Sequence, residues 1–160
     1  MNPPLKVVSV EKIYTDENHN AFTDLCRFKD WYFLVFRSCP DGHMIFPSSR
    51  IVVYRSRDTS TWERCFDFSA VDRDVRDPHL LSFGDKLFVY SGTWPVKEGD
   101  SNFRDMANHL GLCAWTEDGN TWNGPEEMES TRGYYIWRAA SHNGVAYMNG
   151  RKLKAGSVRT

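Results

Sequence analysis

Two aspartates of this chain, Asp24 and Asp77, are candidates for acid–base chemistry. Asp77 stands in the run Arg76-Asp77-Pro78, where a neighbouring guanidinium can shift the pKa of the carboxyl group. A tuned carboxyl group can donate or accept a proton, and paired carboxyl groups cleave glycosidic bonds. We expect Asp77 or Asp24 to act as a general acid/base, with its partner outside these 160 residues.

Further polar and aromatic side chains occur near these aspartates or in the segments that should surround them. Guanidinium groups recognise carboxylates through paired hydrogen bonds, and aromatic rings offer a flat face for a sugar ring. For each residue the alternative is a structural role, in an ion pair or in packing. The candidate substrate-binding residues are Arg37, Arg76, His79, Arg138, His19, Trp94 and Trp137. We expect His43, His109 and His142 to be exposed loop residues without partners.

The segments that must position these residues are repeated along the chain. Residues 20–37 and 75–92 are similar, and residues 136–151 form a weaker third copy. Each copy has two β-rich runs around a tight polar turn, which is the pattern of a β-hairpin. A second strand-turn-strand unit follows each of the first two copies, at residues 51–62 and 112–122.

Two hairpins in each period of about 55 to 60 residues predict a four-stranded antiparallel unit, and serial units of this kind are the blades of a β-propeller. We expect an all-β chain with about 2.5 to 3 blades. Blade 1 covers about 18–70, blade 2 about 73–130, and the start of blade 3 about 133–160. Closed propellers have about four to eight blades, so we expect this chain to be a fragment of one.

The antiparallel order also predicts which parts of the chain meet. The start of the innermost strand and the loop between strands two and three lie at the same edge of a blade, so the long loops 37–50 and 92–109 belong to one face. Binding residues concentrate on such loops. In the register of the repeat, Asp24, His79 and Arg138 occupy one position, and we expect them to converge on the central axis.

Residues 56–62 and 116–122 resemble the Asp-box, Ser-x-Asp-x-Gly-x-Thr-Trp, of sialidases and related propeller proteins. Each is one residue short, and the first lacks the glycine. In such a turn the aspartate accepts hydrogen bonds from backbone amides, and the tryptophan packs between neighbouring sheets. The residues expected in this structural role are Asp58, Trp62, Asp118 and Trp122.

Together with the repeats, these boxes make residues 18–151 similar to the N-terminal half of a sialidase-like six-bladed propeller. The resemblance implies an exo-acting glycoside hydrolase that removes terminal sialic acid, with an arginine cluster for the carboxylate of the sugar, an acidic proton shuttle and a Tyr/Glu nucleophile pair. It places that pair and further arginines in later blades. The family's early Arg-Ile-Pro motif is replaced here by Asn20-Ala21-Phe22, so the identity of the sugar stays open.

Three alternatives remain at this point. A non-catalytic carbohydrate-binding propeller would keep aromatic stacking and lose the acid pair. A scaffold propeller would present an apolar loop face. The run Arg76-Asp77-Pro78 is also similar to a motif of five-bladed furanosidase propellers, in which the aspartate supports the transition state.

Composition narrows the set of partners. A net charge of −1 and a pI of about 6.5 leave no excess of basic residues for a phosphate backbone, so nucleic acid is not expected. The chain has no apolar run of membrane-helix length and no signal peptide after Met1, so we expect a cytoplasmic protein without a membrane partner.

Its four cysteines lack metal-ligand spacing, and no metal or cofactor is expected. The expected partner is a carbohydrate; the oligomeric state is not indicated.

Overall fold

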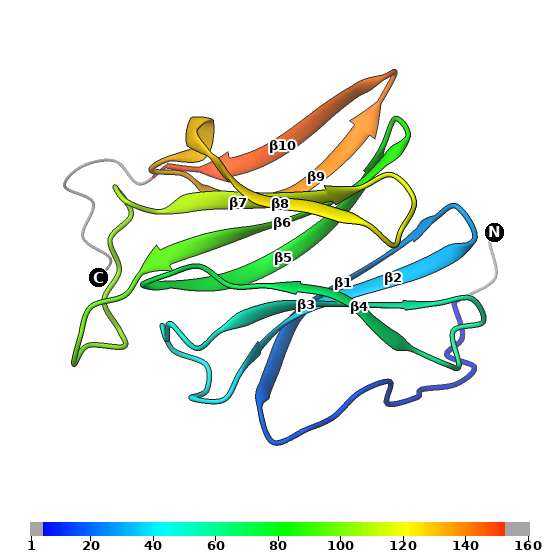
Figure 1. Ribbon diagram of the computed structural model, residues 1–160, viewed down its shortest axis with the longest axis horizontal. Coiled ribbons are helices and arrows are strands. Elements are labelled where there is room, and N and C mark those ends of the chain that lie inside the picture. Colours follow the sequence, from blue (N-terminus) through cyan, green and yellow to red (C-terminus); the bar gives the residue numbers. More distant parts are fainter. Residues whose placement is uncertain (1–4, 153–160) are drawn as a thin grey trace.

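The computed structural model describes residues 5–152, which form three antiparallel β-sheets (Figure 1). The first sheet contains, in spatial order, β1 (His19–Phe28), β2 (Trp31–Cys39), β3 (Arg50–Ser56) and β4 (Glu63–Phe68). The second contains β5 (Arg73–Phe83), β6 (Lys86–Pro95), β7 (Leu110–Thr116) and β8 (Trp122–Met128). A 3-10 turn at Glu129–Thr131 leads to the hairpin of β9 (Tyr135–His142) and β10 (Val145–Arg151).

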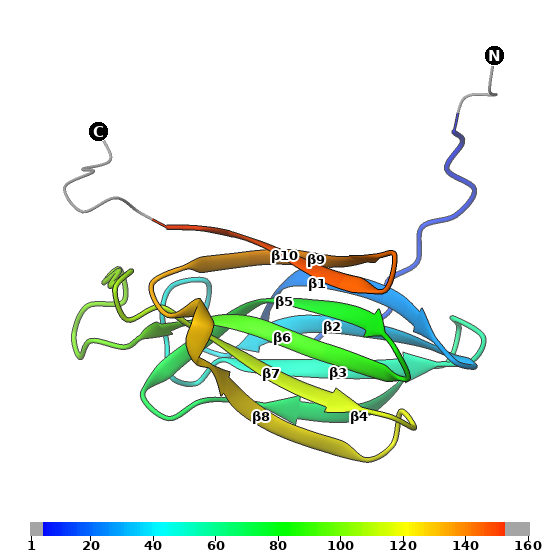
Figure 2. The same cartoon turned by 90° about the horizontal axis from the view of Figure 1, so that it is seen from above.

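The strand order in both four-stranded sheets follows the chain, as in the blades of a propeller. Figure 2 shows the inner strands β1, β5 and β9 together on one side and the outer strands β4 and β8 on the other. The prediction of an all-β, partial propeller is therefore confirmed. Strands β2 and β6 extend further than predicted, so the long loops cover 40–49 and 96–109. No helix within residues 5–152 is long and apolar enough to span a membrane.

The main core lies between the first two sheets. Because side chains alternate along a strand, β2, β3 and β6 each present every second residue to this interface. Removal of each such side chain from water contributes about 1.5–3 kcal/mol to folding. The fully buried members include Phe33, Val35, Ile51, Val53, Val75, Leu87, Val89 and Ala114. This apolar layer fixes how the two inner strands lie beside each other.

Both box-like turns have the expected hydrogen bonds around their aspartates. An oxygen of Asp58 accepts the amides two and three residues further on, each at 2.8 Å. Asp118 accepts the equivalent amides at 2.8 and 2.7 Å. These bonds lower the pKa of Asp118 to about 2. The aspartates therefore close the turns and are not available as proton donors at neutral pH.

The two box tryptophans differ in their packing. Trp122 lies against blade 1, stacked on Phe66 with ring centroids 4.7 Å apart and with its edge toward Phe33. Trp62 is partly exposed, and its indole N–H donates to the carbonyl oxygen of Thr59 in the same turn at 2.9 Å. The prediction that the tryptophan packs between neighbouring sheets is therefore confirmed for Trp122. Within residues 5–152, Trp62 has no aromatic partner.

We expect Trp122→Ala to lower the free energy of unfolding by about 3–5 kcal/mol, because it removes the ring that fills the space between the blades. Trp62→Ala is the matched control and should cost about 1 kcal/mol or less, since its turn bond is exposed. Urea unfolding of the intact protein measures both. Equal losses for the two variants would contradict the packing difference.

Each inner strand contains a β-bulge near its start. The register of β1 shifts between Ala21 and Asp24, and that of β5 between Arg76 and His79. Bulges re-aim side chains and are frequent beside functional sites. Phe22 and Asp77 occupy the equivalent bulge positions and both have positive φ angles, 61° and 50°. In β9 the shift lies one residue nearer the turn, so Arg138 stands within the bulge.

Candidate functional site

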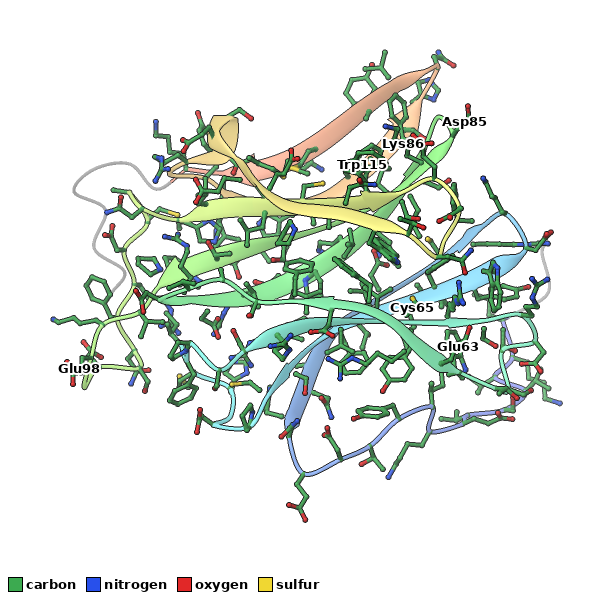
Figure 3. All side chains as sticks on the ribbon, viewed as in Figure 1. Glu63, Cys65, Asp85, Lys86, Glu98 and Trp115 are labelled. Atoms are coloured by element: carbon green, nitrogen blue, oxygen red, sulfur yellow. The ribbon has the colours of Figure 1, made fainter. Side chains whose placement is uncertain are left out.

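The two ends of the sheets carry different groups of residues. Figure 3 shows Glu98, in the loop 96–109, at one end of the molecule, and Asp85 and Lys86, in the β5–β6 turn, toward the other. This agrees with the separation of long loops from hairpin turns that the antiparallel order predicts. The inner-strand bulges lie at the loop end of the sheets, and the candidate site is built there.

The predicted convergence of Asp24, His79 and Arg138 is present. Asp24, which is 8% exposed, lies 3.4 Å from Nδ1 of His79 and forms an ion pair with Arg138. Its carboxylate also accepts the amides of Leu80 at 3.1 Å and Leu25 at 2.9 Å. One carboxylate therefore connects all three blades.

These contacts decide the charge of Asp24. Burial raises the pKa of this carboxyl group, but the contact with His79, the two amides and the charge of Arg138 together bring it below its usual value. An ionised carboxylate with four partners is poorly suited to donate a proton. The geometry therefore makes Asp24 an organising residue and does not favour it as a general acid.

Asp77 has a different environment. It is partly buried in the bulge of β5, and its carboxylate accepts the hydroxyl of Tyr135 from the start of β9. Burial, followed by the charge of Asp77, raises the pKa of Tyr135 above its usual value. Tyr135 is thus a neutral donor that orients Asp77. The sequence did not indicate this tyrosine, because nothing in its neighbourhood distinguishes it from a packed strand residue.

A buried ion network lies behind Asp77. Asp74, which is fully buried, binds Nη2 of Arg37 at 2.6 Å and Nε of Arg76 at 2.5 Å. The side chain of Arg37 is also fully buried, which does not agree with its prediction as a ligand contact, and Arg76 is only 5% exposed. Both arginines compensate Asp74. The sequence did not indicate a role for Asp74, because its two partners, Arg37 and Arg76, come from different blades.

The same two arginines hold the loop between β2 and β3. Arg37 donates to the carbonyl oxygens of Gly42 and Met44, each at 3.0 Å, and Arg76 donates to those of Met44 and His43. This fixes the backbone on both sides of His43. The ion network therefore holds His43 close to the inner-strand bulges.

His43 is exposed, as expected from the sequence, but its ring has neighbours, which was not expected. Its ring centroid lies 5.0 Å from that of His19 and 5.7 Å from that of Phe22. Desolvation by these neighbours, followed by the charges of His19 and Arg76, lowers the pKa of His43. His19, a predicted site residue, thus lies with His43 beside Phe22, the residue of blade 1 that is equivalent to Asp77.

The two predicted stacking tryptophans are placed differently. Trp94 is only 5% exposed and packs against His109 and Tyr135, with ring centroids 4.7 and 5.8 Å away. It supports the site and has no free face for a sugar. Trp137 is 45% exposed and lies 5.3 Å from Tyr135, so it remains available for stacking.

Exposed cations surround this cluster. The guanidinium of Arg151 lies over the ring of Tyr135 at 5.0 Å, and that of Arg104 lies 5.7 Å from the ring of Trp94. Within residues 5–152 neither has a carboxylate at ion-pair distance, and the side chain of Arg138 is 63% exposed despite its bond to Asp24. The arrangement can attract an anionic or hydroxylated ligand.

A groove of about 760 Å³ lies between the two long loops. It is lined by Ile45, Phe46, Pro47, Asp72 and residues 96–101, and by none of the predicted site residues. The amide of Ile45 donates to the carbonyl oxygen of Ser101 at 2.9 Å and joins the loops. In the part of the chain from 5 to 152, no three His, Cys, Asp or Glu side chains gather to hold a metal ion.

His109 is buried beneath the cluster, with 1% of its surface exposed, so its prediction as an exposed loop residue is wrong: the end of the loop 96–109 packs the ring against Trp94 and Tyr135. Burial lowers its pKa from 6.5 to about 4. Between these values the unfolded protein binds more protons than the folded protein, so the free energy of unfolding falls as the pH falls from about 6.5 to 4. The shift in the pKa of His109 changes the free energy of unfolding by about 3 kcal/mol over this pH range. We expect His109→Phe to flatten that part of the pH dependence in urea unfolding; unchanged pH dependence would contradict it.

Comparison with known proteins gives no matching family model and no similar curated protein. Solved structures do match. Trypanosoma rangeli sialidase in complex with sialic acid has a TM-score of 0.53 and 14% identity, over 76% of this chain and 23% of that chain. The same sialidase with 2,3-difluorosialic acid, as a covalent intermediate, has a TM-score of 0.56 and 14% identity, over 82% of this chain and 27% of that chain.

This chain therefore spans about a quarter of the length of the sialidases that it matches. At this identity the likeness concerns the fold alone. The chain folds as part of a sialidase-like β-propeller, with two four-stranded blades and a further hairpin among the residues described.

Proposed function

We propose that this chain forms part of the active site of an exo-acting glycoside hydrolase of sialidase-like type, which acts on terminal sugars of glycans. The observation that carries the proposal is the pair of Asp77 and Tyr135. It joins two blades at the loop end of the sheets, next to the exposed ring of Trp137 and the guanidinium of Arg151.

The hydrogen bond from Tyr135 defines the role of Asp77. The hydroxyl group fixes the orientation of the carboxylate, so Asp77 is placed to accept a proton from the attacking group during hydrolysis. The acid that protonates the leaving oxygen is then expected from another part of the protein. Asp24 acts as an organiser in this scheme, because it fixes His79 and Arg138.

Sugar binding is assigned to the exposed groups. Trp137 offers a face for stacking, and Arg138 and Arg151 offer guanidinium groups for hydroxyl or carboxylate oxygens. Arg37 and Arg76 are excluded from direct contact by their burial against Asp74. The site therefore favours a sugar with hydroxyl or acid groups directed toward the loop end.

A panel of aryl glycosides that includes a sialoside and a furanoside, incubated with the intact protein, tests the proposal. Release of the aglycone from one of them supports a glycosidase, and release from the furanoside alone favours the alternative based on Arg76-Asp77-Pro78. No release, together with measurable binding of a free sugar, would favour a non-catalytic carbohydrate-binding propeller. The neutralisation of Asp24 and Asp74 by cations is the observation in favour of that second candidate.

A further inference from the structure

We infer that His109 is a positioning residue that sets the orientation of Tyr135 against Asp77. The inference rests on the proposed function, because it assigns a supporting group to the same pair. His109 lies at the end of the loop 96–109, directly before β7, and the bond between Tyr135 and Asp77 does not involve it.

Blade 2 departs from the repeat at the position next to His109. Arg37 in β2 and Arg151 in β10 stand at the same position of their hairpins, and blade 2 has Gly92 there. A β-carbon at Gly92 would lie 2.8 Å from Cε1 and 2.9 Å from Nε2 of His109. The imidazole of His109 thus fills the space directly beside Gly92, where a side chain begins in the other two hairpins.

The imidazole of His109 packs against the ring of Tyr135. The centroids of His109 and Tyr135 are 4.9 Å apart with planes inclined by 30°, and Trp94 packs against both rings, 4.7 Å from His109 and 5.8 Å from Tyr135. The carbonyl oxygen of His109 also accepts the amide of Gly133 at 2.9 Å. His109 therefore holds the segment that leads into β9 by its backbone and the tyrosine ring by its side chain.

Packing is the main restraint on the imidazole. Both ring nitrogens are buried, and within residues 5–152 neither makes a hydrogen bond of good geometry; the backbone of Tyr134 is a polar neighbour that partly offsets the effect of burial on the pKa of His109. A flat group held mainly by packing moves when a neighbour gains an atom. The place of Tyr135 therefore depends on the missing side chain at Gly92, and a small displacement of a group that orients a reacting carboxylate is costly to turnover.

Gly92→Ala in the intact protein tests this directly, because it displaces the imidazole without altering Tyr135 or Asp77. We expect kcat for the glycoside cleaved in the panel to fall about 10- to 100-fold while KM changes by less than about threefold. The second readout is the ¹³Cζ NMR signal of Tyr135, assigned with Tyr135→Phe. It should move in the direction that Asp77→Ala, which removes the acceptor of the Tyr135 hydroxyl, moves it.

Two further variants separate positioning from stability. His109→Phe retains a flat ring and should leave the Tyr135 signal and kcat near those of the unchanged protein. Val89→Ala removes buried atoms from the core between the blades, and should lower stability without moving the signal. If Gly92→Ala does not fold, His109→Leu removes the flat ring and is read in the same way.

The inference is overturned if the Tyr135 signal keeps its position in Gly92→Ala, or in His109→Leu where that variant replaces it. It is also overturned if Val89→Ala moves the signal as far. The NMR signal needs no turnover, so a protein that cleaves no glycoside refutes the proposed function while the signal still decides the role of His109.

Discussion

Replacement of Asp77 by asparagine is expected to reduce glycoside cleavage by the intact protein about 10²- to 10⁴-fold, the range that general acid–base groups contribute. Asparagine keeps the shape of the side chain and its oxygen can still accept the hydroxyl of Tyr135, but it cannot accept a proton. Because the bond is retained, the free energy of unfolding should change by less than about 1 kcal/mol. The value of kcat/KM and a urea unfolding curve measure the two effects.

Asp85→Asn is the matched control. Asp85 is exposed in the β5–β6 turn at the opposite end of the sheet (Figure 3), so its replacement should change neither turnover nor stability. Undiminished turnover in Asp77→Asn would remove Asp77 from the mechanism. An equal loss in both variants would show that the effect does not come from the site.

Replacement of Asp74 by asparagine is expected to destabilise the protein by about 3–5 kcal/mol, the range observed when one partner of a buried ion pair is removed. The reason is that Arg37 and Arg76 keep their charges at buried positions after their common carboxylate is lost. The same change should loosen the loop that contains His43, since both arginines hold its backbone. Urea unfolding measures the first effect, and hydrogen exchange of the loop amides measures the second.

Asp67→Asn provides the comparison at the surface. Asp67 also pairs with two arginines, Arg50 and Arg64, but all three side chains are partly exposed. Exposed ion pairs contribute about 0–1 kcal/mol, so this variant should remain near the unchanged protein. If Asp74→Asn costs no more than Asp67→Asn, the buried network does not hold the loop in the way described.

The repeat in the sequence was sufficient to predict the architecture. Alternation of apolar residues, polar turns and a period of about 55 to 60 residues determine which strands pair, because sheet pairing between consecutive strands is local. The same register predicted that Asp24, His79 and Arg138 would meet, and they do. Residues at the same distance from the hairpin turn lie side by side in adjacent inner strands, so the repeat carries this information even though the bulge of β9 is shifted by one residue.

The partners of the buried charges were decided by the tertiary structure. Which arginine compensates Asp74, which hydroxyl binds Asp77, and whether Arg37 reaches a ligand depend on contacts between different blades and loops. A one-dimensional pattern shows which face of a strand is apolar, but not the depth of a polar residue on the other face. Gly92 illustrates the difference. In the sequence it is only a missing arginine, and the imidazole of His109 that requires it comes from a loop whose path only packing determines.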